Sequence, residues 1–289
     1  LRGTCCQRTS MTDRLVDRYA LFGNPVQHSK SPVIYTGFAK ATGLDIEYGL
    51  IEAPLGGFAA AADAFRASGA KGGNVTAPFK LDAFAWATDR MERAAIVGAT
   101  NCLKFEPDGR VLAEMFDGVG LANDIESNLG FGLRGKRVLL LGAGGAARGA
   151  LAAFLERGPA EVVVVNRTAD KATDLARHLG ERGKVVGCGY AELGRNERFD
   201  LVVNATSASM KGELPPIDAA AFAHAALTYD MTYGKCLTPF LRLAQNSGVP
   251  RLADGVGMLV EQAAEAWVWW HGLRPDTKAV IDKLTVPLK

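Results

Sequence analysis

The sequence is poor in the residues that build disulfide frameworks or metal sites. Its 289 residues include only five cysteines and four histidines. No two cysteines stand in a CxxC pair and the histidines are scattered, so the spacing of a zinc site is missing. An odd number of cysteines also argues against a disulfide framework. We therefore predict a protein that needs no metal and works in the reducing cytoplasm.

The sequence also has neither a large excess of charge of one sign nor a long apolar run. The formal net charge is +2, from 33 basic and 31 acidic residues, and like charges form no block. This balance does not indicate binding to nucleic acid or to an anionic membrane surface, which would require clustered positive charge. The most apolar stretch, AWVWW at 266–270, is far too short to span a bilayer, and we interpret it as part of a core helix.

The N-terminal residues carry no targeting signal that we recognise. The segment LRGTCCQRTS has arginines but no apolar core, so it resembles neither a signal peptide nor a membrane anchor. We expect residues 1–11 to form a disordered extension, with Met11 as the natural start.

The sequence is rich in alternating β-rich and Ala-rich segments. With 48% hydrophobic residues the chain can build a sizeable core, and its length suits two domains. From residue 19 to 115 short β-rich runs alternate with helical stretches, which is typical of an α/β sheet with parallel strand pairs. Residues 100–106 and 110–116 are separated by a Pro-Asp-Gly turn, so we predict a hairpin there.

A second α/β run begins after residue 136. Residues 137–168 are predicted to form strand, glycine loop, helix and strand, which is one βαβ unit. Val- and Leu-rich segments typical of buried parallel strands follow at 185–187, 200–206 and 227–231. Residues from 254 onward are again helical. The chain therefore divides into two α/β domains, with the boundary in or beside 118–135.

The segment GAGGAA at 142–147 is the main cofactor signal. It fits the pattern G-x-G-x-x-A, follows a predicted strand and opens a predicted helix. The glycines permit a tight turn and let the backbone approach a pyrophosphate, which the free N–H groups of the helix N-terminus attract. We predict dinucleotide binding here, against the alternative of a loop that serves packing only.

The end of the next strand indicates which dinucleotide binds. An NAD site has an acidic residue there to hold the ribose 2′-hydroxyl. This chain instead has Asn166, Arg167 and Thr168, with Lys171 one turn on. Two cations suit a 2′-phosphate, so NADP is favoured over NAD. Thr168 as the N-cap of an exposed helix is the structural alternative, and it does not exclude phosphate binding.

Two polar segments of the first domain are candidates for binding a substrate. Ser29 and Ser31 surround a loop that enters a helix, where hydroxyl and N–H groups would receive a carboxylate. Ser31 before a proline is equally an ordinary helix start. Asn74 and Thr76 share a strand face ahead of Lys80, which would otherwise be a surface lysine. Physical chemistry alone leaves both alternatives open.

An ordered series of segments resembles the shikimate dehydrogenase family over residues 19–285. It runs from GNPVQHSKSP through NVTAPFK, GATN, FDGVG, GAGGAAR, NRT, NATS, YDMTY and TPF to ADGVGMLVEQAA. The resemblance implies an α/β fold with a substrate-binding domain (12–117 and 254–289), an NADP-binding Rossmann domain (118–253) and an active-site cleft between them. It also implies reversible reduction of 3-dehydroshikimate to shikimate, a step of aromatic amino acid biosynthesis.

The same resemblance implies roles for individual residues. Lys80 and Asp117 are expected to form the catalytic pair, and the two serines to bind the substrate carboxylate. The substrate-binding residues are expected to be Ser29, Ser31, Asn74, Thr76, Asn101, Tyr233 and Gln262. The cofactor-binding residues are expected to be Gly142, Ala143, Gly144, Gly145, Ala146, Asn166, Arg167, Thr168, Lys171, Asn204, Thr206, Met231 and Gly255.

Residues 114–118 depart from the family pattern D-N-T-D-G. The chain has Glu114, Met115 and Phe116 before the matching Asp117, and Cys102 stands where Thr is common. In a strand that runs to residue 117, Met115 and Asp117 share one face. We predict that these changes reshape the pocket wall around an intact catalytic pair.

Two alternatives to this function follow from the departures. One is a family member that prefers quinate, another small hydroxy acid, or NAD. The other is a nucleotide-binding regulator without turnover, against which the presence of both Lys80 and Asp117 argues. The expected partners are a small-molecule substrate and the cofactor, in a monomer or homodimer.

Overall fold

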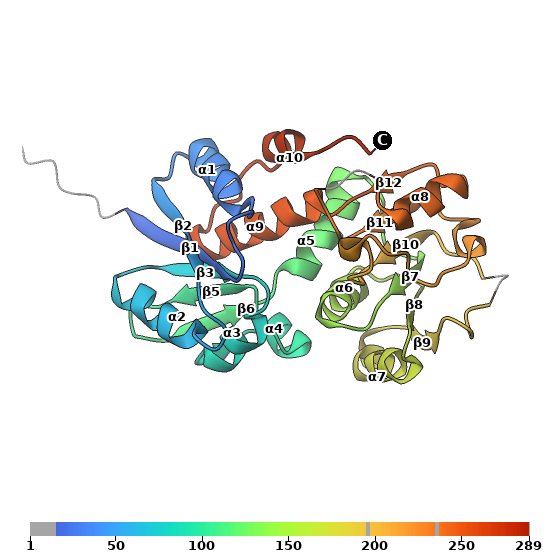
Figure 1. Cartoon of the computed structure of the whole chain (residues 1–289), viewed down its shortest axis with the longest axis horizontal. Helices are drawn as coiled ribbons and strands as arrows, with labels where there is room; N and C mark the ends of the chain where they lie inside the picture. The colour runs from blue at the N-terminus through green and yellow to red at the C-terminus, as the bar shows by residue number, and fades with distance from the viewer. Residues whose placement is uncertain (1–15, 195–196, 235–236, 289) are drawn as a thin grey trace, which may run out of the picture.

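Two six-stranded sheets, one from each half of the chain, organise the protein (Figure 1). The structure, a computed structural model, describes residues 16–194, 197–234 and 237–288. The expected extension at 1–11 lies outside these residues. The prediction of an α/β fold is confirmed, because helices cover both sheets and parallel pairs dominate them. No helix in the three described ranges is long and apolar enough to cross a membrane.

The first sheet has the strand order β2-β1-β3-β5-β6-β4. β2, β1 and β3 run parallel, whereas β5 is antiparallel to both β3 and β6, so the predicted hairpin is present. The strands are β1 Asp17–Gly23, β2 Ile46–Glu52, β3 Gly72–Val75, β4 Asp89–Arg90, β5 Cys102–Phe105 and β6 Val111–Glu114. The helices are α1 Ser31–Thr42, α2 Phe58–Ala67, α3 Lys80–Trp86 and α4 Glu92–Val97.

The second sheet is wholly parallel, in the order β12-β11-β10-β7-β8-β9. Its central strands are runs of buried Val and Leu because helices cover both faces. The strands are β7 Arg137–Leu141, β8 Glu161–Asn166, β9 Val185–Gly189, β10 Leu201–Asn204, β11 Leu227–Asp230 and β12 Leu252–Ala253. The helices are α6 Gly145–Leu155, α7 Ala169–Leu179, α8 Pro239–Asn246 and the short η2 Gly180–Arg182, η3 Ser209–Lys211 and η4 Ala219–Phe222.

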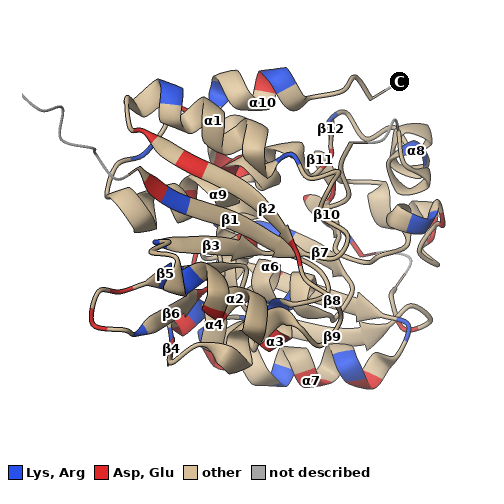
Figure 2. Cartoon of the chain, turned by 60° about the vertical axis from the view of Figure 1, so that its left-hand side comes forward, with Lys and Arg blue, Asp and Glu red and all other residues tan. Residues whose placement is uncertain are grey.

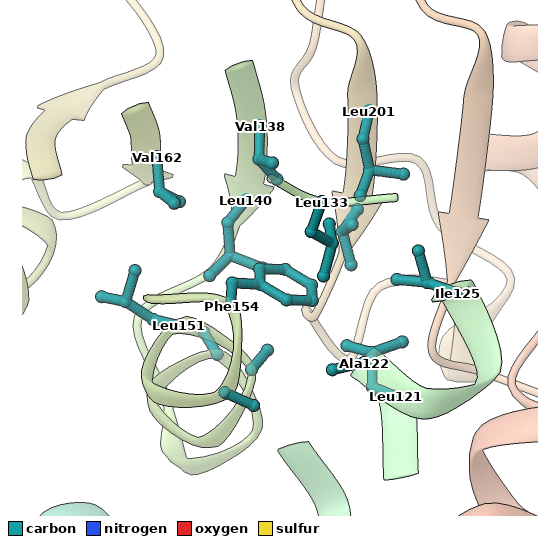
Figure 3. Packing of buried hydrophobic residues seen from close by; sticks show 14 of the residues in the cluster. Leu121, Ala122, Ile125, Leu133, Val138, Leu140, Leu151, Phe154, Val162 and Leu201 are labelled. Atoms are coloured by element: carbon teal, nitrogen blue, oxygen red, sulfur yellow. The ribbon is translucent and has the colours of Figure 1, made fainter. Parts of the chain in front are cut away.

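Two helices pack side by side between the sheets (Figure 1). They are α5 Asp117–Asn123, which continues into the π-helical turn η1 Asp124–Asn128, and α9 Val256–His271, which is followed by α10 Lys278–Leu284. The AWVWW segment lies in α9 and Trp267 is fully buried, as predicted. Apolar residues of α5 and η1 also join those of α6 in the core beneath the second sheet (Figure 3).

Glycines allow α5 to approach its neighbours with almost no gap. A Cβ atom on Gly118 would overlap the backbone carbonyl of Gly149 in α6. A Cβ on Gly120 would lie 2.5 Å from the backbone nitrogen of Gln262 in α9. Because glycine has no side chain, these backbones can touch. The helix that begins with Asp117 is therefore held against both the helix of the glycine loop and the helix of Gln262.

The outer helices mix charges of both signs. Basic and acidic residues are interspersed along α7 and α10 in Figure 2, in keeping with a net charge near zero. Ion pairs such as Arg177–Asp174 and Lys278–Asp282 join them at 2.8 Å. Exposed pairs of this kind add little to stability, so the interior, rather than the surface charges, holds the fold together.

Candidate active site

A cavity of about 360 Å³ lies where the carboxyl ends of β1 and β3 meet α5 and α9. All the predicted catalytic and substrate-binding residues line it: Ser29, Ser31, Asn74, Thr76, Lys80, Asn101, Asp117, Tyr233 and Gln262. Residues far apart in the sequence meet here because α9 returns from the C-terminal end of the chain to the first sheet.

Lys80 and Asp117 form a direct charged pair in this cavity. The Lys80 Nζ donates to Asp117 Oδ2 at 2.5 Å, and the two side chains are 33% and 17% exposed. Lys80 is the first residue of α3, and Asp117 is the first residue of α5. A short, charge-assisted hydrogen bond between two helix starts fixes both groups in the lining of the cavity.

Asp117 is not a strand residue, so that part of the prediction is wrong. β6 ends at Glu114, and the backbone N–H of Phe116 donates to Asn101 Oδ1 at 2.8 Å instead of joining the sheet. A side chain has replaced the strand partner, and the chain turns into α5. Met115 and Asp117 therefore do not share a strand face.

Asn101 connects the charged pair to α9. Because its oxygen accepts from Phe116, its nitrogen faces the other way and donates to Asp117 Oδ1 at 2.6 Å and to Gln262 Oε1 at 2.9 Å. Each carboxylate oxygen of Asp117 thus has its own donor. Gln262 in turn donates from Nε2 to the carbonyl of Leu259 at 2.8 Å. A primary amide has two N–H groups, so both of those on Asn101 are used within the protein.

The two serines lie close together at the start of α1. Ser29 Oγ donates to Ser31 Oγ at 3.1 Å, and the backbone N–H of Ser31 donates to Ser29 Oγ at 3.1 Å. Ser31 is the first residue of the helix and makes no capping hydrogen bond, since Lys30 occupies the N-cap position. The alternative that Ser31 is merely an N-cap is therefore wrong, and both hydroxyls line the cavity.

Asn74 is held by a residue that the sequence analysis missed. The Tyr48 hydroxyl donates to Asn74 Oδ1 at 2.7 Å, while Asn74 Nδ2 donates to the carbonyl of Asn101 at 3.3 Å. Tyr48 stacks on Tyr35, with ring centroids 4.1 Å apart. Tyr48 comes from the edge strand β2, and no motif of the sequence reveals which side chains meet across strands.

Replacing Tyr35 by Phe should raise the free energy of unfolding by about 1–3 kcal/mol, because a buried hydroxyl without a partner costs about that much. Tyr35 is fully buried, and its hydroxyl makes no hydrogen bond of regular geometry to a described residue, although Asn74 lies beside it. Burial also holds its pKa well above the usual value, so the group stays neutral. Urea unfolding measures the change.

Tyr48→Phe is the matched control for that prediction. It removes the same kind of hydroxyl, but one that donates to Asn74, and so should lower the free energy of unfolding. Equal effects of the two substitutions would contradict the interpretation of Tyr35.

The departures from the family pattern lie behind the cavity rather than on its wall. Met115 packs with the apolar residues of α4, and Phe116 packs against Cys102 and stacks edge-on with Trp269 at 5.7 Å. Cys102, Met115 and Phe116 do not line the cavity, so the prediction that they reshape its wall is wrong. Glu114 also turns away: its carboxylate accepts from the Met115 N–H at 2.8 Å, and burial raises its pKa.

Replacing Phe116 by Thr, the residue common in the family, should therefore change stability more than substrate preference. Loss of the buried ring should lower the free energy of unfolding by about 3 kcal/mol. The KM for substrate should stay within about twofold, because the side chain does not reach the cavity. Urea unfolding and steady-state kinetics measure the two effects; a new substrate preference at unchanged stability would contradict the prediction.

A second cavity, of about 580 Å³, lies at the carboxyl ends of the second sheet, and we call it the cofactor cleft. Of the predicted cofactor residues, it is lined by Gly142, Ala143, Gly144, Gly145, Ala146, Asn166, Arg167, Thr168, Lys171 and Thr206. Met231 and Gly255 line the first cavity instead. Thr168 does stand at the N-cap of α7, but its side chain makes no capping hydrogen bond.

Asn204 lines neither cavity, in contrast to its predicted role. It is fully buried and donates to Ser209 Oγ at 3.1 Å and to Asp230 Oδ1 at 3.2 Å. Its oxygen accepts from the backbone of Thr206 at 3.1 Å. Asn204 therefore shapes the loop after β10, because all of its polar atoms are engaged inside the protein.

One wall of the cofactor cleft was not anticipated from the sequence. This wall consists of Ala205, Ser207, Ala208, Lys211, Glu213, Leu214, Pro215 and Pro216, all of which follow β10. Tyr190, which follows β9, also lines the cleft and was not anticipated either. Burial raises the pKa of Tyr190 to about 12, although nearby Arg167 acts to lower it. Among the residues described, no three His, Cys, Asp or Glu side chains gather as metal ligands would.

Three domain families match the chain. They are described as shikimate dehydrogenase substrate binding domain (residues 21–103), shikimate / quinate 5-dehydrogenase (residues 123–212) and shikimate 5′-dehydrogenase C-terminal domain (residues 255–285). Together they include most residues that line the two cavities, whereas Asp117, Met231 and Tyr233 lie between the matched ranges.

Similar proteins cover nearly the whole chain. A shikimate dehydrogenase (NADP⁺) of Nitrosospira multiformis is 53% identical over 93% of this chain and 97% of its own. Among solved structures, an Ael1 enzyme from Pseudomonas putida is 56% identical, with a TM-score of 0.91 over 94% of this chain and 100% of that one. The shikimate 5-dehydrogenase of Thermus thermophilus, solved with NADP(H) and shikimate, is 30% identical, with a TM-score of 0.81 over 92% and 98%.

Proposed function

The chain belongs to the shikimate dehydrogenase family, and we propose from this that it reversibly reduces 3-dehydroshikimate to shikimate with NADPH. The observation that carries the proposal is the Lys80–Asp117 pair, 2.5 Å apart, in a cavity lined by hydroxyl and amide groups. Such a cavity suits a small, polyhydroxylated acid, and the charged pair suits proton transfer.

The catalytic roles follow from the chemistry of ketone reduction. When bound, NADPH supplies the hydride. The carbonyl oxygen must receive a proton as the hydride arrives, from a group within hydrogen-bond reach. We assign this task to Lys80 and Asp117 acting as a pair, since the hydrogen bond between Nζ and Oδ2 holds the transferable proton beside the cavity. In the reverse direction the pair takes the proton from the hydroxyl.

The substrate-binding roles follow from the polarity of the cavity wall. We assign Ser29 and Ser31 to the substrate carboxylate, because both hydroxyls line the cavity at the start of α1. The proton that Ser29 donates to Ser31 can turn to a carboxylate oxygen when the substrate binds. We assign Thr76, Asn101 and Gln262 to the ring hydroxyls. Tyr233 completes the carboxylate end, and Asn74 positions the wall.

The cofactor cleft fits NADP by two observations. A Cβ atom placed on Gly144 or Gly145 would meet nothing within 4 Å, so the glycine loop leaves open space at the start of α6. A pyrophosphate in this space would accept hydrogen bonds from the backbone N–H groups. Arg167 and Lys171 line the same cleft without an ion pair to any described residue, so they are available to a 2′-phosphate. No acidic residue ends β8, which favours NADP over NAD.

The two sheets support the domain division expected from the sequence. We propose a substrate domain of residues 12–117 and 254–289 and a Rossmann domain of residues 118–253, because β1–β6 form one sheet and β7–β12 the other. We also propose a cytoplasmic monomer or homodimer. Cys102 and Cys188 are free thiols, as a reducing compartment requires.

A matrix of four assays tests the proposed function. Purified protein is given shikimate or quinate, each with NADP⁺ or NAD⁺, and the reduced nicotinamide is followed by absorbance. We expect the highest kcat/KM with shikimate and NADP⁺. Preference for quinate or NAD⁺ would support the family alternative, and no turnover with any pair would support the regulator without activity.

A further inference from the structure

Three cations line the cofactor cleft, and only two of them were expected. Arg167 and Lys171 stand at the end of β8 and the start of α7, whereas Lys211 belongs to the turn η3 after β10. All three line the cleft, and none has an ion pair or side-chain hydrogen bond to a described residue. A cation without a protein partner in a phosphate-binding cleft is available to an anion.

The order of the strands places Lys211 on its own side of the glycine loop. β7, which leads into that loop, lies between β10 and β8. The loop after β10 also touches the glycine loop, because a Cβ on Gly142 would lie 3.1 Å from the carbonyl of Ala205. Lys211 and the pair Arg167 and Lys171 therefore flank the glycine loop from opposite sides.

A buried hydrogen-bond network fixes the turn that carries Lys211. Ser209 is 1% exposed and donates from Oγ to Asp230 Oδ2 at 2.5 Å, and it accepts from Asn204 at 3.1 Å. The turn then closes at Gly212, whose φ of 74° lies in the left-handed region that glycine tolerates. The backbone that carries Lys211 is thus held in place, which lowers the backbone part of the entropic cost of binding an anion there.

We propose that Lys211 binds the pyrophosphate of NADP and is a cofactor-binding residue of this chain. The proposal rests on the proposed function, because it presumes a dinucleotide in the cleft. Arg167 and Lys171 are placed for the 2′-phosphate at the end of β8, while the glycine loop offers backbone N–H groups but no charged side chain. Lys211, beside that loop, is the remaining cation among the described residues that line the cleft.

Glu213 gives the proposal a control of opposite sign. It lines the same wall two residues after Lys211, and it makes no ion pair with that lysine. A carboxylate there repels phosphate groups, so Glu213→Gln should lower the KM for the cofactor. Lys283, on α10 and outside the cleft, gives a neutral control for loss of one positive charge.

The test is the KM for NADP⁺ and for NAD⁺ of the variant Lys211→Gln. Both values should rise about threefold to tenfold with kcat nearly unchanged, and the rise should shrink in high salt, which screens exposed charges. The preference for NADP⁺ over NAD⁺ should stay the same, because both cofactors contain the pyrophosphate. Arg167→Gln should instead raise the KM for NADP⁺ alone, and Lys283→Gln should change neither.

Two results would overturn the proposal. An unchanged KM for both cofactors would show that Lys211 binds no phosphate. A rise for NADP⁺ only would place Lys211 at the 2′-phosphate instead of the pyrophosphate. If the protein turned over no substrate, the proposed function would fail separately, and calorimetric titration of the same variants with NADP⁺ and NAD⁺ would still decide the role of Lys211.

Discussion

Replacing Lys80 by Met should lower kcat for shikimate oxidation by about two to four orders of magnitude, the usual contribution of a general acid–base group. Met keeps most of the volume of the side chain but cannot hold or transfer a proton. Lys80 is 33% exposed, and among the described residues its charge pairs only with Asp117, so the fold should survive. Steady-state kinetics with NADP⁺, beside urea unfolding, measure both effects.

Asp117→Asn provides the companion measurement. It should lower kcat to a similar extent, and the double variant should lose little more, because groups that act as one unit are not additive. The KM for NADP⁺ should change little in all three variants, since neither residue lines the cofactor cleft. If the kcat of the Lys80→Met variant stayed within tenfold of that of the unmodified enzyme, the proposed catalytic role of the pair would be wrong.

Replacing Gly118 by Ala should lower the free energy of unfolding by about 3 kcal/mol or more and also reduce kcat. The added methyl group would overlap the backbone carbonyl of Gly149, and two helix backbones cannot yield as a flexible side chain does. Any separation of α5 from α6 also moves the neighbouring Asp117, which begins α5. Urea unfolding and kcat on the same preparation measure the two losses.

Gly132→Ala is the matched control. A Cβ at Gly132 would meet nothing within 4 Å, so the same chemical change should alter stability by less than about 0.5 kcal/mol. If Gly118→Ala unfolded at the same urea concentration as Gly132→Ala, the close approach of α5 to α6 would be refuted.

The regular parts of the fold were predictable from local sequence. The βαβ unit at 137–168 could be recognised because continuous Val and Leu runs flank a glycine loop, and the hairpin because a Pro-Asp-Gly turn separates two β-rich runs. The end of β6 was not predictable, because it depends on the side chain of Asn101. This side chain accepts the hydrogen bond that the Phe116 N–H would otherwise donate to a neighbouring strand.

The site shows the same division between local and distant causes. The motifs led to Lys80, Asp117 and their neighbours, which do meet in one cavity. Tyr48 and Lys211 were missed because a strand register and a turn conformation place them, and neither leaves a sequence pattern. Asn204 differs from its predicted role for the opposite reason: it matches a motif, yet its side chain is fully buried and lines neither cavity.

The bonds of Asn101 have a consequence for selectivity among substrate analogues. Its two N–H groups are already satisfied by Asp117 and Gln262 before any ligand enters. A ring hydroxyl that binds there exchanges one hydrogen bond for another, so its net gain is small. When an analogue without that hydroxyl binds, the Asn101 amide keeps its hydrogen bonds to Asp117 and Gln262. No buried donor is then left without a partner, so the analogue avoids that penalty. We therefore expect this corner of the cavity to tolerate deoxygenated rings, and discrimination among substrates to come from other residues of the cavity wall.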